Sequence, residues 1–190
     1  MTNLLFFLTV FTSIRLDIKK NKLNKSRVYL AIPILIYNFY NFYNSKKELI
    51  ESDANQSIST DLMSAMFISD IILFIKNNVN DYSLYFHHLF CTFCYLISKF
   101  NGTPKIYTLM SFPELMIIGN IIKKKYRSIF YILIILFRYP FWFLLFENYK
   151  KITNSILSKN ALYGSITMFL LDTYWLSQVM IKLSNKYLKY

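Results

Sequence analysis

The sequence has little glycine, few acidic residues and almost no histidine or cysteine. Among 190 residues there are three Gly, four Pro, two Cys and two His, and ten Asp and Glu stand against 22 Lys and Arg. No internal repeat and no matched pair of Gly- or Pro-interrupted apolar segments is present, although both are typical of secondary transporters. The connections between apolar segments are too short for a receptor with large external loops. A seven-helix receptor or transporter is therefore the less favoured interpretation.

Both cysteines, Cys91 and Cys94, lie in one apolar segment. Their spacing on a helix is poor for a disulfide, so they do not indicate the redox compartment. His87, Cys91 and Cys94 share a helix face, but a metal site normally draws its ligands from more than one element. The sequence therefore predicts no metal site and no bound cofactor.

Apolar residues make up 55% of the chain and aromatic residues 19%. A soluble domain of this size could not bury so many, so we expect an all-α, polytopic transmembrane helix bundle. Seven apolar segments recur along the chain, and each predicts one span. They are Leu4–Leu16, Val28–Tyr43, Thr60–Ile75, Ser83–Phe100, Ile106–Ile122, Ser128–Phe146 and Ala161–Ile181.

The net charge of +12 raises the question of nucleic-acid binding. The basic residues lie between apolar segments rather than on a polar domain, so we expect no nucleic-acid partner; the partners expected are membrane lipids, with basic loops on an anionic lipid surface. With the N-terminus lumenal and the C-terminus cytosolic, fourteen Lys and Arg are cytosolic, seven lie on the opposite side, and Arg138 is within a span. This bias favours seven spans in that orientation.

The first apolar segment could be a secretory signal or a retained anchor. No basic residue precedes it and no small-x-small cleavage site follows it, whereas basic residues cluster directly after it. This pattern favours a retained anchor. We therefore divide the chain into an anchor span with a basic cytosolic loop, residues 1–27, and a transmembrane domain, residues 28–190.

His87 and His88 stand side by side in the fourth segment, where imidazole is costly to bury. At 1.5 Å per residue they lie about 6–8 Å from the cytosolic end of their span, and Asp70 lies about 8 Å from the same surface. Asn120 falls near that face too. The sequence therefore predicts one polar layer in the cytosolic half of the bundle.

This layer permits two kinds of function. Adjacent histidines point about 100° apart on a helix, so one is expected to face the interior and the other a helix contact. A histidine held in one tautomer by Asp70 could act as general base or nucleophile in acyl transfer, with acyl-CoA as co-substrate. The same layer could instead bind a lipid head group or a sterol without any reaction.

Further polar residues lie at greater depth. Glu114 and Arg138 are consistent with a buried structural pair, and each could instead contact a ligand. Asp172 and Trp175 of the last segment are interpreted as a hydrogen-bonding patch between helices or as a ligand contact.

Together these motifs resemble the TLC-domain family, which includes ceramide synthases and the translocon-associated TRAM proteins. The resemblance rests on the order and spacing of five short motifs between Val28 and Lys182. They are Ile68-Ser-Asp70, Phe86-His87-His88, Glu114-Leu-Met-Ile-Ile-Gly-Asn120, Leu136-Phe-Arg138-Tyr-Pro140 and Leu171-Asp172-Thr-Tyr-Trp175. It implies a helix bundle around a cytosol-facing intramembrane cavity, in the endoplasmic reticulum or a related internal membrane.

One departure from the family narrows the implied function. Ceramide synthases carry His-Asp-x-x-Asp downstream of the double histidine, where this chain has Glu114-Leu-Met-Ile. The resemblance therefore implies the non-synthase branch, with a role in membrane lipid composition, lipid sensing or lipid-linked trafficking. Enzyme and non-enzyme versions stay open: a histidine-based acyltransferase, or a lipid sensor or trafficking adaptor.

Overall fold

A computed structural model describes residues 2–51, 54–102, 105–120 and 122–187. Within these ranges the chain forms only helices and their connections, with no strand, so the predicted all-helical class is confirmed. The elements are α1 (Thr2–Ser13), α2 (Lys20–Asn44), α3 (Ala54–Lys76), α4 (Tyr82–Asn101), α5 (Lys105–Leu109), the 3-10 helix η1 (Phe112–Asn120), α6 (Lys124–Asn148), the 3-10 turn η2 (Tyr149–Lys151) and α7 (Ser155–Tyr187).

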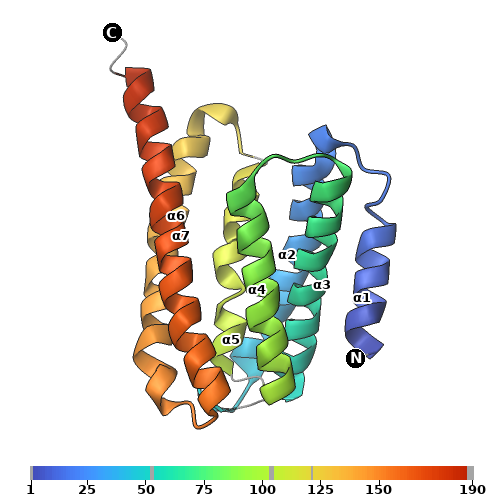
Figure 1. Ribbon diagram of the computed structural model, residues 1–190, viewed down its shortest axis with the longest axis vertical. Helices are drawn as coiled ribbons and strands as arrows, with labels where there is room; N and C mark the ends of the chain where they lie inside the picture. The colour runs from blue at the N-terminus through green and yellow to red at the C-terminus, as the bar shows by residue number, and fades with distance from the viewer. Residues whose placement is uncertain (1, 52–53, 103–104, 121, 188–190) are drawn as a thin grey trace.

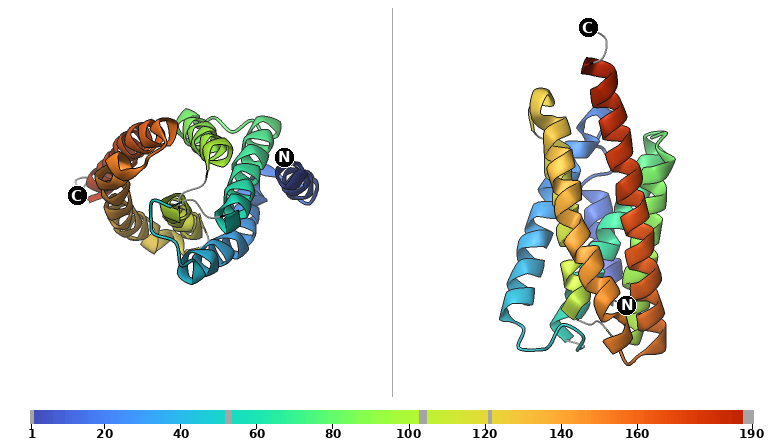
Figure 2. Two further views of the ribbon diagram at one scale, coloured as in Figure 1. Left: turned by 90° about the horizontal axis from the view of Figure 1, so that it is seen from below. Right: turned by 90° about the vertical axis from the view of Figure 1, so that its left-hand side faces the viewer.

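Successive passes of the chain run in opposite directions, so that the N-terminus and the C-terminus lie at opposite ends of the bundle (Figure 1). Six segments form a closed ring in which each contacts the next, in the order α2, α3, α4, α7, α6 and η1. Figure 2 shows this ring from below, with α1 outside it. Helix α1 packs on α3, and the α5–η1 segment leans into the ring.

The turn between α3 and α4 sets the relative height of these two helices. Asn78 adopts a positive φ of 50°, the Val79 N–H donates to the Phe74 carbonyl, and the Asn78 N–H donates to the Ile75 carbonyl. This is the Schellman arrangement that commonly ends a helix. Asp81 then caps α4 by accepting from the Leu84 N–H at 3.2 Å. The double histidine consequently lies level with the last turns of α3.

The N-terminal helices differ from the prediction. Residues 20–27, expected in a cytosolic loop, form the first turns of α2, which begins at Lys20 rather than Val28. Lys and Arg are good helix formers, so a basic stretch need not be a loop. The change places Arg27 on a helix inside the bundle.

The fifth pass is not the continuous helix expected over Ile106–Ile122. Helix α5 ends at Leu109, and η1 follows after a turn. Pro113 has no backbone N–H and cannot donate a helical hydrogen bond, which favours a break here, although α2 and α6 accommodate Pro33 and Pro140. A 3-10 helix rises about 2.0 Å per residue against about 1.5 Å for an α-helix, so a short segment reaches further along the bundle.

Two stretches are long and apolar enough to cross a membrane, Gln56–Lys76 and Tyr126–Lys151. Of the first, 67% is buried inside the bundle, and a core helix of a soluble protein would pass the same test. Of the second, only 22% is buried. These two stretches are consistent with membrane association, but seven spans do not follow from them.

Gly119→Ala tests the close approach of η1 to α6. A Cβ at position 119 would lie 2.2 Å from Tyr131 Cε1, so we expect a loss of about 1–3 kcal/mol in the free energy of unfolding. In the control Gly164→Ala, the Cβ would meet Cys94 Sγ at 3.7 Å, and losing a glycine within a helix should stabilise by up to about 1 kcal/mol. Thermal unfolding in detergent compares the two, and equal effects would contradict this packing.

Candidate functional site

The site is built around Asp70, a fully buried carboxylate on α3. Arg15, which follows α1, donates from Nη2 to Asp70 Oδ1 at 2.5 Å and from Nη1 to Ser69 Oγ at 2.8 Å. Arg27 of α2 donates from Nε to Asp70 Oδ2 at 2.8 Å. Both arginine residues are also buried, at 2% and 6% exposure. One carboxylate thus joins α3 to α2 and to the segment after α1.

His88 belongs to this cluster. Its Nε2 lies 3.0 Å from Arg27 Nη2, and a guanidinium can only donate, so Nε2 accepts. The proton of the neutral ring is then on Nδ1, which lies 3.6 Å from Asp70 Oδ2. The ring is edge-on to Phe67 and Phe74 at 5.0 and 5.1 Å. His88 is therefore enclosed between α2, α3 and α4 as a structural residue, held by one hydrogen bond at Nε2 and by ring contacts, while Nδ1 makes no hydrogen bond to any residue that the structure describes.

His87 points away from this cluster, with its ring at 87° to that of His88. Its Nε2–H donates to Glu114 Oε1 of η1 at 3.1 Å, and its Nδ1 lies 3.7 Å from Cys91 Sγ. The ring packs edge-on to Trp175, with 5.3 Å between centroids. The carboxylate that orients His87 is therefore Glu114, not Asp70.

Helices α6 and α7 contribute a second buried ion pair. Arg138 Nε lies 3.2 Å from Asp172 Oδ2, and the Trp142 indole N–H donates to the same oxygen at 2.6 Å. The Arg138 guanidinium is 5.7 Å from the ring centroids of both Trp142 and Trp175, within the range of cation–π attraction. The Trp175 indole N–H donates to Ser83 Oγ at the start of α4.

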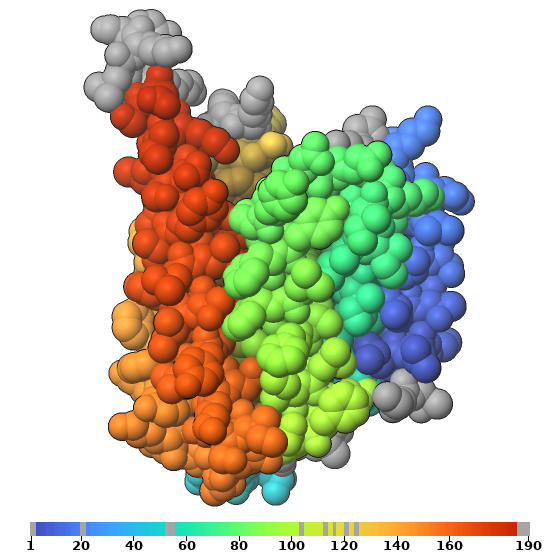
Figure 3. Space-filling view, in the orientation of Figure 1, coloured from blue at the N-terminus to red at the C-terminus, as the bar shows by residue number. Residues whose placement is uncertain are grey.

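These groups surround a cavity of about 330 Å³ between α2, α4, η1, α6 and α7. Its inner wall carries His87, Glu114 and Arg138, and Arg27 lines one side. The wall reaches the exposed Asp81 and Lys182, at the end where the last turns of α7 stand away from α4 (Figure 3). Neither Asp70 nor His88 lines it. The cavity combines cationic, anionic and aromatic groups, so it suits a polar ligand with an apolar part.

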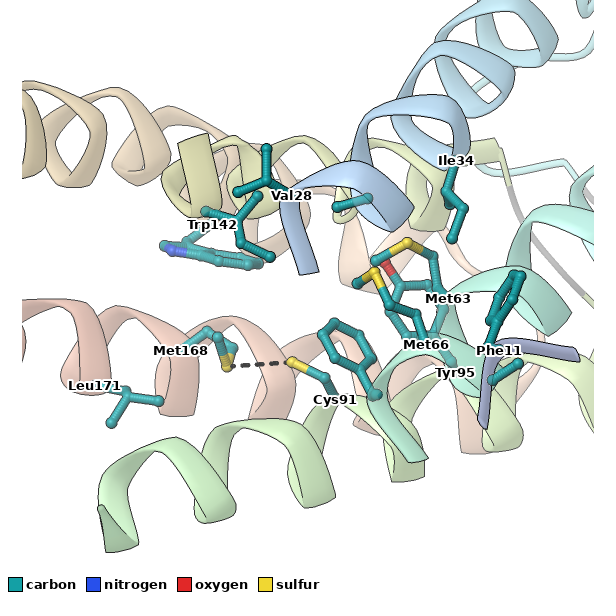
Figure 4. Close-up of a cluster of buried hydrophobic side chains, with 14 residues drawn as sticks. Phe11, Val28, Ile34, Met63, Met66, Cys91, Tyr95, Trp142, Met168 and Leu171 are labelled. Carbon is teal, nitrogen blue, oxygen red and sulfur yellow. Dashed lines mark hydrogen bonds between the residues drawn. The ribbon is translucent and has the colours of Figure 1, made fainter. Parts of the chain in front are cut away.

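An apolar cluster lies beside this cavity. Cys91 Sγ contacts Met168 Sδ at 4.0 Å, and Trp142 lies in the same cluster (Figure 4). Trp142 also borders a second hollow of about 230 Å³ between α6 and α7. That hollow is lined otherwise by Phe143, Phe146, Ser165, Ile166, Phe169 and Leu170.

The structure regroups the residues that the sequence singled out. Asp70 meets His88, as depth counting predicts, but this pair lies behind the cavity wall. The predicted pairing of Glu114 with Arg138 is wrong, because Glu114 is hydrogen-bonded to His87 and Arg138 forms an ion pair with Asp172. These partners follow from the order of helices around the ring, which depth alone does not reveal.

The sequence also singled out Trp175 and Asn120 as candidate site residues. Trp175 lines the cavity as expected of a ligand contact, whereas the side chain of Asn120 lies outside the part of the chain that the structure describes. Among the described residues, no group of three His, Cys, Asp or Glu side chains could hold a metal.

Sequence reasoning missed Arg15 and Arg27, which it counted as loop charges. The signal was the residue type: the chain has eighteen Lys and only four Arg. Three of these four arginines are buried, and no lysine whose side chain is described is buried. Arginine is less strongly hydrated than lysine and forms bidentate pairs, so it is favoured in buried ion pairs.

Comparison with known proteins finds no family model, no curated protein and no solved structure that matches this chain.

Asp70→Asn should strongly destabilise the bundle, because it leaves two buried guanidinium groups without a counter-charge. We expect a loss of about 3–5 kcal/mol in the free energy of unfolding. The control Asp17→Asn removes an exposed carboxylate and should change it by less than about 0.5 kcal/mol. Both are measured by thermal or denaturant unfolding in detergent. Equal stability of the two variants would show that Asp70 does not hold the helices together.

Proposed function

We propose that this chain is a TLC-like, multi-pass membrane protein that binds an acyl lipid in the cavity beside His87 and Glu114. The observation that carries this proposal is a charged cavity inside a bundle whose exterior is apolar. Soluble domains have the opposite distribution, because charged side chains are rarely buried and large apolar patches are rarely exposed.

The exterior supports placement in a membrane. Exposed aromatic and aliphatic side chains occur on α1, α2, α4, α6 and α7, including Phe6, Phe39, Phe93, Leu133 and Leu170. In a membrane these side chains would contact lipid instead of water, so their exposure would carry no hydrophobic cost. Seven alternating passes agree with a lumenal N-terminus and a cytosolic C-terminus, with the basic end and the cavity facing the cytosol. An endoplasmic reticulum or related internal membrane is part of the same proposal.

The family resemblance gains support from the position of its motifs. The residues that carry it lie far apart in sequence, yet they gather at one level of the ring. His87, Glu114, Arg138 and Trp175 line the cavity, and Asp70 and Asp172 hold arginines at its wall.

The two hollows suit the two parts of an acyl lipid. The polar cavity reaches the basic end and is large enough for a head group. The hollow between α6 and α7 is almost purely apolar and opens on the exterior, where Phe143 and Leu170 are exposed. An acyl chain there would lie along the outer face of the bundle, with Trp142 between it and the interior. Binding with no reaction, as in a lipid sensor or trafficking adaptor, needs only these features.

Acyl transfer is a second form of the same proposal, favoured by the Glu114–His87 hydrogen bond. A carboxylate that holds Nε2–H leaves Nδ1 as the basic nitrogen. That nitrogen would take the proton of an acceptor hydroxyl or amine while its oxygen or nitrogen attacks the thioester carbonyl of acyl-CoA. The proton would then pass to the departing thiolate. His87 must first release its contact with Cys91 for this step.

Val179→Trp tests whether the cavity holds the lipid. Val179 lines the cavity and Met180, the next residue, is exposed. An indole at position 179 should fill the cavity and lower the amount of lipid that copurifies by about tenfold, whereas Met180→Trp should leave it unchanged. Mass spectrometry of extracted lipids, per mole of protein, measures both. Protein that carries no lipid in its wild-type form would overturn the proposal.

His87→Ala distinguishes catalysis from binding. If acyl transfer occurs, loss of the base should lower the rate with labelled acyl-CoA by about 10²–10⁴-fold, and Glu114→Gln should lower it less, since the orienting hydrogen bond is kept. The copurified lipid should persist in both variants. An unchanged rate in His87→Ala would exclude the histidine mechanism, and a wild-type protein with bound lipid and no turnover would establish the non-catalytic form.

A further inference from the structure

The buried cluster around Asp70 carries an excess positive charge. Two guanidinium groups, Arg15 and Arg27, share this one carboxylate. His88 adds no negative charge, because its ring accepts from Arg27 and is neutral in this arrangement. The cluster therefore holds one uncompensated positive charge among groups that are almost fully buried. A buried excess charge is costly unless a partner is supplied.

Arg27 is the member of the cluster that can meet such a partner. It lines the cavity, and Arg15 does not. Its Nε bonds to Asp70 and its Nη2 to His88. Within the described part of the chain, Nη1 of Arg27 makes no hydrogen bond. Guanidinium nitrogens bind phosphate and carboxylate oxygens strongly, so Nη1 suits an anionic oxygen inside the cavity.

The other charges around the cavity define where this oxygen would lie. Glu114 accepts a hydrogen bond from His87 and keeps its negative charge on the inner wall, whereas Arg138 forms an ion pair with Asp172. At the mouth, Lys182 adds a positive charge and Asp81 a negative one. An anion between Arg27 and Lys182 would stay away from the inner wall, where Glu114 would repel it.

We propose that the cavity binds an acyl lipid with an anionic phosphate head group, held between Arg27 and Lys182. This inference rests on the proposed function, which supplies the acyl lipid, and adds the chemical class of its head group. The phosphate enters from the basic end, and its charge compensates the excess at the Arg15–Arg27–Asp70 cluster.

Two lipids that share one acyl chain test this inference. Oleoyl lysophosphatidic acid carries the phosphate and monooleoylglycerol does not. Equilibrium binding to the purified protein in maltoside detergent can be followed by Trp fluorescence, because Trp175 lines the cavity. We expect the wild-type protein to bind the phosphate lipid at least about tenfold more tightly.

Two matched pairs of variants locate the preference. Arg27→Gln and Arg15→Gln each remove one guanidinium from Asp70, but only the first removes a group that lines the cavity. Arg27→Gln should therefore abolish the tenfold preference. Arg15→Gln removes the excess charge but keeps the guanidinium that lines the cavity, so it should lower the preference less. Lys182→Gln should lower the preference about two- to threefold, and Lys159→Gln, an exposed lysine earlier on α7, should not. If Arg27→Gln does not fold, the variant Lys182→Gln still tests the inference, because Lys182 is exposed.

The outcomes separate this inference from the proposed function. Equal binding of the two lipids would overturn the phosphate site and leave acyl-lipid binding intact. Failure of both lipids to bind would overturn the proposed function itself. Competition by glycerol 3-phosphate as strong as that by the phosphate lipid would identify a soluble phosphate ligand instead and contradict the inference. Equal loss of preference in Arg15→Gln and Arg27→Gln would also contradict it.

Discussion

The structure depends on the pairing of Asp70 with two arginine side chains. This carboxylate holds Arg15 and Arg27, and Arg27 in turn holds His88. Four segments of the chain are thereby fixed at one level of the ring. In a low-dielectric interior, none of these groups is stable without the others, so the cluster forms together or not at all. By fixing these segments at one level, the cluster also sets the position of the neighbouring cavity along the bundle.

The two adjacent histidines have separate roles because successive residues of a helix face different directions. His88 is enclosed by Arg27 and aromatic rings and closes the structural cluster. His87 faces the cavity and bonds to Glu114. The buried cluster and the wall of the cavity thus meet on one turn of α4. The two rings are in edge contact, with centroids 5.2 Å apart.

Hydrophobic patterning was sufficient to predict the helices, and depth counting was sufficient to place Asp70 level with His88. Neither could predict partners, because depth leaves out the position of each helix around the ring. Glu114 and Arg138 have similar depths but lie on different parts of the wall. The irregular fifth pass was missed because hydropathy does not register where a helical hydrogen-bond ladder breaks, as it does between α5 and η1. Arg15 and Arg27 were missed because charge counting treats arginine and lysine alike.

The central claim is that an acyl lipid occupies the cavity beside His87. The most direct measurement is an experimental structure of the protein in lipid nanodiscs, at a resolution that shows bound lipid. The account predicts density for one lipid, with its head group near Lys182 and within hydrogen-bonding reach of Arg27, and with its chain toward Trp142. A cavity without lipid density, or a water-filled path open at both ends of the bundle, would contradict it.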